Sequence, residues 1–120
     1  MHETSLIQFT LDAVARQARA HGIRRVSDIL LIIGELRGAI PDQMEYAFRI
    51  LTASESEGGM FAGTKLDIEY RPALLQCRDC GHRFPVTVET LASAACPHCG
   101  SSTYQIISGN ELLIDSFRGE

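Results

Sequence analysis

The sequence predicts an α+β fold, in which a small mixed β-sheet and two helices form one domain and a metal-stapled subdomain is inserted into it. Three observations predict this arrangement. Two segments repeat apolar residues at helical spacing, three segments have the composition of strands, and all four cysteines lie between positions 77 and 99. A chain of 120 residues can hold a small core together with a subdomain too small to be stable by burial alone.

Two segments have the pattern of amphipathic helices. The first begins at Ser5 and ends at the stop signal around Gly22, and the second begins at Pro41 and ends at the polar run 54–59. Their apolar positions are Leu6, Phe9, Ala13, Val14, Ala18 and Ala20 in the first segment and Met44, Ala47, Phe48 and Leu51 in the second. We expect two helices, each with one apolar face.

Three further segments have the pattern of strands. Residues 24–35 are rich in branched side chains and apolar on both faces, which predicts an inner strand, covered on both sides, that ends at Gly34. Residues 65–70 alternate between polar and apolar, and Pro72 closes that strand. Residues 111–117 also have a strand pattern, and because little chain remains, we expect them to return to the first sheet.

The cysteines form two matched motifs, each followed by a glycine that tolerates the positive φ of a tight turn. These motifs are Cys77-Arg78-Asp79-Cys80-Gly81 and Cys96-Pro97-His98-Cys99-Gly100. Their spacing is typical of a four-cysteine zinc site, in which the ion is bound tetrahedrally by sulfur and has no position left for water. The site is therefore expected to be structural, and a zinc-dependent hydrolase is excluded because it needs an open position on the metal.

Two other interpretations of the cysteines fit less well. Disulfides require an oxidising compartment, but the first five residues lack the features of a secretory signal, so we expect a reduced, cytoplasmic protein. A thioredoxin-like redox pair would need one C-x-x-C at a strand-to-helix turn, whereas two motifs occur here without a neighbouring βαβ pattern.

The composition changes beyond Pro72. Residues 74–104 contain every cysteine and few large apolar side chains, so we expect the metal to replace a core there. This predicts one domain formed by 1–73 and 105–120 and a second formed by 74–104. Fifteen acidic against eleven basic residues give a net charge of −4, which opposes binding to nucleic acid. No apolar run is long enough to span a membrane, so neither nucleic acid nor a membrane is an expected partner.

The amino terminus offers a second set of metal ligands. The amine of Met1, the amide nitrogen of His2 and the Nδ1 atom of His2 could close two chelate rings on one ion. Nickel(II) and copper(II) suit planar nitrogen donors, whereas zinc prefers a tetrahedral site. The alternative is that His2 is a frayed terminal residue without a role, and these two residues alone do not decide between the two interpretations.

Motifs spread along nearly the whole chain resemble the HypA/HybF family. They are Met1-His2-Glu3-x-Ser5-Leu6, Ile33-Gly34-Glu35-Leu36-x-Gly38, the two cysteine motifs with Ser101 after the second, and Gly109-x-Glu111-Leu112. Members of this family are nickel metallochaperones of hydrogenase maturation. The resemblance implies a nickel-binding domain of mixed sheet and helices with an inserted zinc ribbon, and no enzymatic activity.

The resemblance also implies roles for particular residues. His2 would be the principal nickel ligand together with the Met1 amine, and Glu3 would contribute its backbone amide to nickel or its carboxylate to a partner. The zinc ligands would be Cys77, Cys80, Cys96 and Cys99. The implied partners are a GTPase of the HypB type and a hydrogenase large-subunit precursor, and because some members serve urease, urease maturation proteins are further candidates.

Some residues depart from the family pattern or allow two interpretations. Thr4, Arg37 and Asn110 differ from the residues usual at their positions, which bears on partner choice more than on nickel. His98 could contact nickel or tune a thiolate, although such a residue more often faces water. Glu35 could face the nickel site or be an ordinary charged turn residue.

A second function remains open on the sequence alone. The chain could be a zinc-ribbon module that binds a protein or a nucleic acid, in which case His2 would be irrelevant. The acidic composition and the absence of tryptophan disfavour the nucleic-acid version. The version that binds a protein is harder to exclude by sequence.

Overall fold

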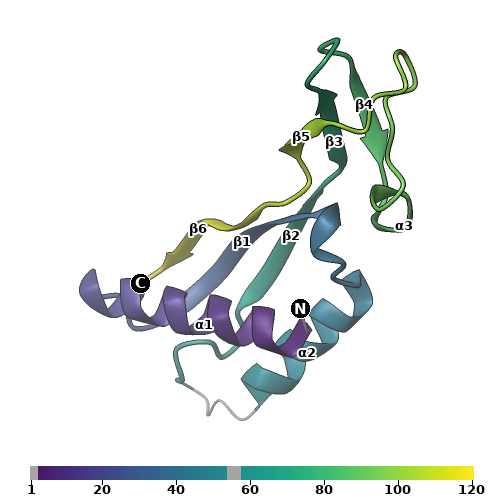
Figure 1. Ribbon diagram of the computed structural model, residues 1–120. Coiled ribbons are helices and arrows are strands. Elements are labelled where there is room, and N and C mark those ends of the chain that lie inside the picture. The colour runs from purple at the N-terminus through teal and green to yellow at the C-terminus, as the bar shows by residue number, and fades with distance from the viewer. Residues whose placement is uncertain (1–2, 54–57) are drawn as a thin grey trace. The chain divides into compact units, whose positions relative to one another are not determined.

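The computed structural model describes residues 3–53 and 58–120 and divides them into two compact units. The first contains the described residues of 1–32, 39–69 and 113–120, and the second contains Ile33–Gly38 and Tyr70–Leu112. The strands, which the ribbon in Figure 1 labels, form two three-stranded sheets, and the first has the order β2-β1-β6. Its strands are β1 (Val26–Gly34), β2 (Lys65–Arg71) and β6 (Leu112–Gly119). In the described part of the chain, no helix has both the length and the apolar character needed to cross a membrane.

Helix α1 (Glu3–Ala20) confirms the first predicted helix and begins two residues before Ser5. Its buried residues are Leu6, Ile7, Thr10, Leu11, Val14, Ala15 and Ala18. The prediction that Phe9 and Ala20 share this face is wrong, because at about 100° per residue they project away from it, and Phe9 is 57% exposed. Buried Thr10 donates its hydroxyl to the carbonyl of Leu6 at 2.9 Å, which satisfies the polar group inside the core.

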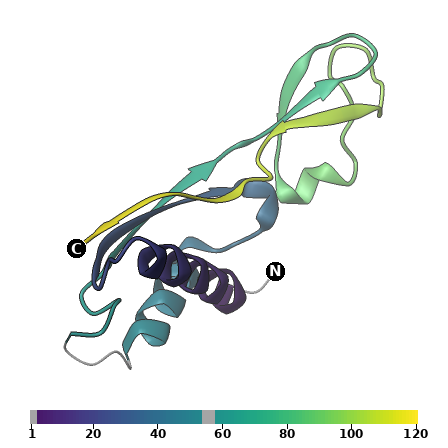
Figure 2. The ribbon, with the colours of Figure 1, turned by 90° about the vertical axis from the view of Figure 1, so that its left-hand side faces the viewer.

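Helix α2 (Pro41–Ala53) confirms the second predicted helix and packs against α1. It begins with proline, whose missing N–H would have no partner in the first turn of a helix. Met44, Ala47 and Phe48 are buried, at the i, i+3, i+4 spacing of one helical face. Both helices lie on the same face of the first sheet (Figure 2).

Strand β1 is the central strand of the first sheet, as its continuous apolar run predicted. The expectation that it is covered on both sides is wrong for its first half, where Ser27 is exposed and Asp28 and Leu30 are half-buried. The physical reason is that α1 and α2 cover only one face of the sheet (Figure 2). An inner position in the hydrogen-bonded order is therefore not the same as burial on both faces.

Strand β6 returns to the first sheet beside β1, which confirms the prediction for the last strand. Its end is joined to β1 by an ion pair in which the Arg118 Nε atom donates to both carboxylate oxygens of Asp28, at 3.0 and 3.1 Å. The hydroxyl of Ser27 also donates to the carbonyl of Arg118 at 3.1 Å. These contacts attach the last strand of the chain to the start of β1 within the first unit.

The second unit is a small antiparallel sheet of order β4-β3-β5. Its elements are β3 (Ala73–Cys77), β4 (Arg83–Val86), the short helix α3 (Val88–Leu91), β5 (Tyr104–Ser108) and the 3-10 turn η1 (Glu35–Arg37). The expectation that a metal replaces the core there needs a correction. The unit has a small apolar core of its own, which consists of Ala73, Leu75, Phe84 and Val86 together with Cys77 and Cys96.

Candidate metal centre

The two cysteine motifs form turns with the same backbone hydrogen bonds. In the first, the Cys77 N–H donates to His82 at 2.8 Å and the Gly81 N–H donates back to Cys77 at 3.0 Å. In the second, the equivalent bonds join Cys96 to Ser101 and Gly100 to Cys96, both at 2.8 Å. Each turn closes at a glycine with positive φ, 79° in the first and 77° in the second, as the sequence predicted.

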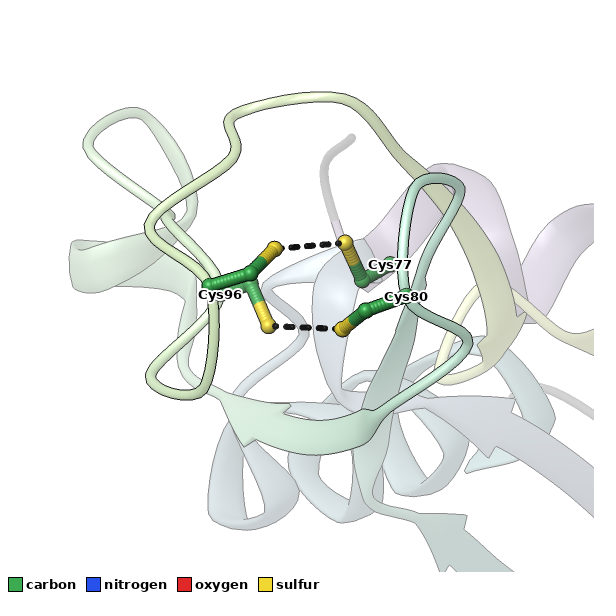
Figure 3. A group of neighbouring side chains, drawn as sticks. Cys77, Cys80 and Cys96 are labelled. Carbon is green, nitrogen blue, oxygen red and sulfur yellow. Dashed lines mark hydrogen bonds between the residues drawn. The ribbon is translucent and has the colours of Figure 1, made fainter.

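These turns bring the four sulfur atoms together. All four Sγ atoms lie within 4.8 Å of one another, and the Cys77–Cys99 and Cys80–Cys96 pairs are each 3.5 Å apart. Figure 3 shows the sulfur atoms of Cys77, Cys80 and Cys96 pointing toward one common centre. Cys77 and Cys96 are buried, whereas Cys80 and Cys99 are exposed, so the centre lies at the surface of the second unit.

The donor set fits a tetrahedral thiophilic ion. A bonded sulfur pair would be about 2.05 Å apart, so the observed separations describe thiols and not disulfides, and all four cysteines are free. Four sulfurs at about 2.3 Å from one zinc ion would be about 3.8 Å from each other, which lies within the range of the separations here. The four side chains need only small movements to bind zinc, and they leave no position for a fifth ligand.

Backbone N–H groups and the hydrogen bond between the two sulfurs shift the pKa values of Cys77 and Cys99. The N–H of Cys80 donates to the sulfur of Cys77 and, against desolvation, lowers the pKa of Cys77 to about 7. The Ser101 N–H favours the Cys99 thiolate, but the hydrogen bond between the Cys99 and Cys77 sulfurs, together with desolvation, outweighs it and raises the pKa of Cys99 to about 12. Cys77 is therefore the more acidic thiol of the two.

The second pair behaves in the same way. Desolvation disfavours the Cys96 thiolate, but N–H groups of Cys99 and His98 donate to it and lower its pKa. The His82 N–H favours the Cys80 thiolate, but desolvation and the hydrogen bond to Cys96 outweigh it and raise the pKa of Cys80. Each pair thus combines one sulfur whose pKa is lowered with one whose pKa is raised. A divalent cation would displace the remaining thiol protons and leave four thiolates around one ion.

Polar contacts tie the two cysteine turns to each other. The hydroxyl of Ser101 donates to the carboxylate of Asp79, which lies between the cysteines of the other turn. The Arg78 N–H donates to the carbonyl of Thr103 at 2.9 Å, and the Thr103 N–H donates to the Ser101 hydroxyl at 3.2 Å. Sequence reasoning did not assign a role to Asp79 or Thr103. Ser101 was part of the family motif, but only the fold shows which residue it bonds.

The histidines next to the centre face each other. The rings of His82 and His98 are stacked with their centroids 5.5 Å apart, and the His82 ring is also stacked with that of Phe84, at 6.4 Å. The His98 N–H, and not its ring, contacts the centre, by donating to the Cys96 sulfur at 3.4 Å. Because this contact uses the backbone, it does not decide between the two interpretations of the His98 side chain.

The predicted nickel ligands are only partly described. Met1 and His2 lie outside the described residues. Glu3 begins α1, and its carboxylate accepts a hydrogen bond from the Ile40 N–H at 3.2 Å. Glu35, the other candidate, accepts a hydrogen bond from the Ala73 N–H at 3.1 Å within the second unit. Its carboxylate therefore has a partner of its own in the protein.

Comparison with known proteins places the chain in a family. Residues 1–119 match the family model described as "Hydrogenase/urease nickel incorporation, metallochaperone, hypA". The hydrogenase maturation factor HypA of Moorella thermoacetica is 35% identical over 126 aligned positions that cover both chains completely. The factor of the same name from Chlorobium limicola is 38% identical over 97% of this chain and 94% of its own.

Solved structures agree in fold. The solution structure of the Ni metallochaperone HypA from Helicobacter pylori superposes with a TM-score of 0.65, at 24% identity, over 99% of this chain and 97% of that one. A second solution structure, of a HypA protein, gives a TM-score of 0.68 at 22% identity over 100% of this chain and 97% of that one. These findings confirm the resemblance seen in the sequence and the predicted α+β class, and a metallochaperone is not an enzyme. The chain belongs to the HypA family of metallochaperones for hydrogenase and urease nickel incorporation.

Proposed function

We propose that this protein binds Ni(II) at its amino terminus and delivers it to a hydrogenase large-subunit precursor, while the four cysteines hold a structural Zn(II). The observation that carries this proposal is the family match over residues 1–119, which includes the Met1-His2-Glu3 start. The amino terminus offers nitrogen donors and the cysteines offer sulfur donors, which supports two ions with different roles. Nitrogen donors in a plane suit nickel, and four thiolates suit zinc.

The position of Glu3 bears on how it would take part. Because its carboxylate accepts the Ile40 N–H, we assign the backbone amide of Glu3, not the carboxylate, to the nickel side. Nickel would therefore be held by the Met1 amine, the imidazole and amide of His2, and the backbone at Glu3.

The proposed partners follow from the family and from the transfer of an ion. A HypB-type GTPase would dock with the loaded protein, and a hydrogenase large-subunit precursor would receive the nickel. Urease maturation proteins are further candidates, since the family description names urease. We place these reactions in the cytoplasm, where the four thiols stay reduced. A purified GTPase partner that binds this chain only when Met1 and His2 are present would support this part of the proposal.

Nickel titration by calorimetry tests the central proposal. Zinc-loaded protein with an untagged amino terminus is compared with His2→Ala and with His21→Ala, which changes an exposed histidine at the end of α1. We expect one nickel site in the wild type and in His21→Ala and none in His2→Ala, with equal zinc content in all three. Equal nickel binding by His2→Ala would remove the amino-terminal site and favour the zinc-ribbon interaction module.

The same titration should depend on pH. Protons compete with nickel for an imidazole, so affinity should weaken as the pH falls through the histidine range near ~6.5. The direction is fixed because protonated His2 cannot bind the ion. An affinity that does not change between pH 7.5 and pH 5.5, values on either side of that ~6.5 range, would contradict His2 as a ligand.

A further inference from the structure

One segment of the second unit comes from a distant part of the sequence. The Ile33–Gly38 segment follows the end of β1 and precedes α2, yet it belongs to the same compact unit as Tyr70–Leu112. The segment contains no cysteine and supplies no ligand to the metal centre. Its contacts within the unit nevertheless connect it to that centre.

The first contact is made by a carboxylate. The Ala73 N–H donates to Glu35 at 3.1 Å across 38 positions of sequence. Ala73 is the first residue of β3 and Cys77 is the last. Glu35 therefore fixes the start of the short strand that ends in a sulfur of the metal centre.

The second contact is apolar. Leu36 packs against the core cluster whose members include Leu75, Phe84, Cys77 and Cys96. The two cysteines in this cluster are the buried members of the metal centre. Side chains in a close-packed core transmit small displacements to their neighbours. The position of Leu36 therefore affects the core side chains that orient both sulfurs.

Backbone contacts hold the segment in register. The Leu36 N–H donates to Gly109 at 2.7 Å and the Gly34 N–H donates to Glu111 at 2.8 Å. A Cβ atom on Gly34 would lie 2.0 Å from the Gly109 oxygen. The two chain segments thus approach to a distance that only glycine permits at position 34.

We propose that the Ile33–Gly38 segment is a positioning element of the four-cysteine centre, in which Glu35 and Leu36 slow the loss of the metal by holding β3 and the buried cysteines in place. Neither residue touches the ion. The dependence is mutual: a bound ion fixes Cys77 and Cys96, and this keeps the segment ordered. The inference rests on the proposed zinc occupancy but requires nothing of nickel.

Zinc release into a chromogenic chelator tests the proposal. Glu35→Ala and Leu36→Ala should each release zinc about tenfold faster than the wild type, as is typical when a residue that supports metal ligands is lost. Glu35→Gln keeps an oxygen that can accept the Ala73 N–H, so its release rate should stay near that of the wild type. Val88→Ala, which shortens an exposed apolar side chain of the second unit, is the matched control.

The outcomes separate this inference from the proposed function. A wild-type protein that holds no zinc would overturn the zinc assignment itself. Zinc that is held equally well by wild type, Glu35→Ala and Leu36→Ala would overturn the positioning role alone. A release rate for Glu35→Gln as fast as that of Glu35→Ala would also count against it, because the loss would then not follow the hydrogen bond.

Hydrogen exchange on the unaltered protein gives an answer even if the variants fold poorly. In the zinc-loaded protein the Gly34 and Leu36 amides should be protected, and removal of zinc should abolish this protection. Amides of β1 up to Leu31, in the first unit, should stay protected under both conditions. Protection of the Gly34 and Leu36 amides that survives zinc removal would refute the mutual dependence.

Discussion

The two units of this protein are stabilised in different ways. The first buries large apolar side chains from two helices and a central strand, including Leu6, Ile7, Ile29, Leu31 and Met44. The core cluster of the second consists of six buried residues, of which two are cysteines and one is alanine. Burial of apolar area can stabilise the first unit by itself, whereas the second has too few large side chains for this.

This difference predicts which unit would need a metal. A small sheet with a few buried side chains stays marginal until an additional link closes it. In the second unit that link would be the cluster of four sulfurs, which joins the end of β3 to the turn before β5. The first unit can therefore fold without an ion, and the second should depend on one.

Removal of zinc should have the largest effect. A structural zinc site contributes on the order of 10 kcal/mol to the folding of small metal domains, so chelation should unfold the second unit and leave the first folded. Two-dimensional NMR would detect this as collapse of the Leu75 and Phe84 amide signals, while those of Leu11 and Leu31 persist. Dispersed signals from both units after chelation would show that the apolar core of the second unit keeps it folded without zinc.

A cavity in the first core should give the next largest effect, without affecting the metal. Leu31 is 1% exposed, so Leu31→Ala should lower the free energy of unfolding of the first unit by about 3 kcal/mol. Leu113→Ala, at a position 46% exposed, is the control and should change little. Denaturant unfolding together with zinc analysis would check both. A loss of zinc from Leu31→Ala would break the independence of the two units.

Zinc binding by the second unit should depend steeply on pH. Cys80 and Cys99 have raised pKa values, that of Cys99 to about 12, so both are protonated near neutral pH without metal. Zinc must displace at least these protons, and its affinity should fall about a hundredfold per pH unit as the solution becomes more acidic. Calorimetry in buffers of different ionisation enthalpy counts the protons released. A count of none would contradict the raised pKa values of Cys80 and Cys99.

The smallest effect is expected at the surface of the first unit. Arg118 donates hydrogen bonds to Asp28 and lowers the pKa of that carboxyl. The ionised pair therefore stabilises the fold above the ordinary aspartate pKa of about 3.9, and this contribution is lost as the pH falls through the lower pKa of the folded state. Asp28→Asn should lower the melting temperature slightly at pH 7 and not at all once the wild-type carboxyl is protonated.

The melting temperatures of the wild type and of Asp28→Asn can be measured by far-UV circular dichroism, which follows α1 and α2. The two conditions are pH 7 and a pH at which the Asp28 carboxyl is protonated. Because the Arg118 side chain is 81% exposed, salt should also reduce the difference at pH 7. An equal loss of stability at both pH values would indicate packing instead of charge.

Much of the fold follows from local patterns in the sequence. Helical spacing predicted α1 and α2, alternation predicted β2, and the paired cysteine motifs predicted four sulfurs at one point. These features depend on neighbours a few positions apart, whose geometry the backbone itself sets. The family resemblance rests in the same way on short motifs in a fixed order, and the comparisons confirm it.

Only the tertiary structure decided which distant groups meet. No periodicity shows that Glu35 bonds the start of β3 or that Asp79 bonds Ser101. These two contacts join backbone or side-chain groups that lie 38 and 22 positions apart. Which groups meet depends on how strands that are distant in sequence pair in the folded chain, and the residues around each position do not specify that pairing.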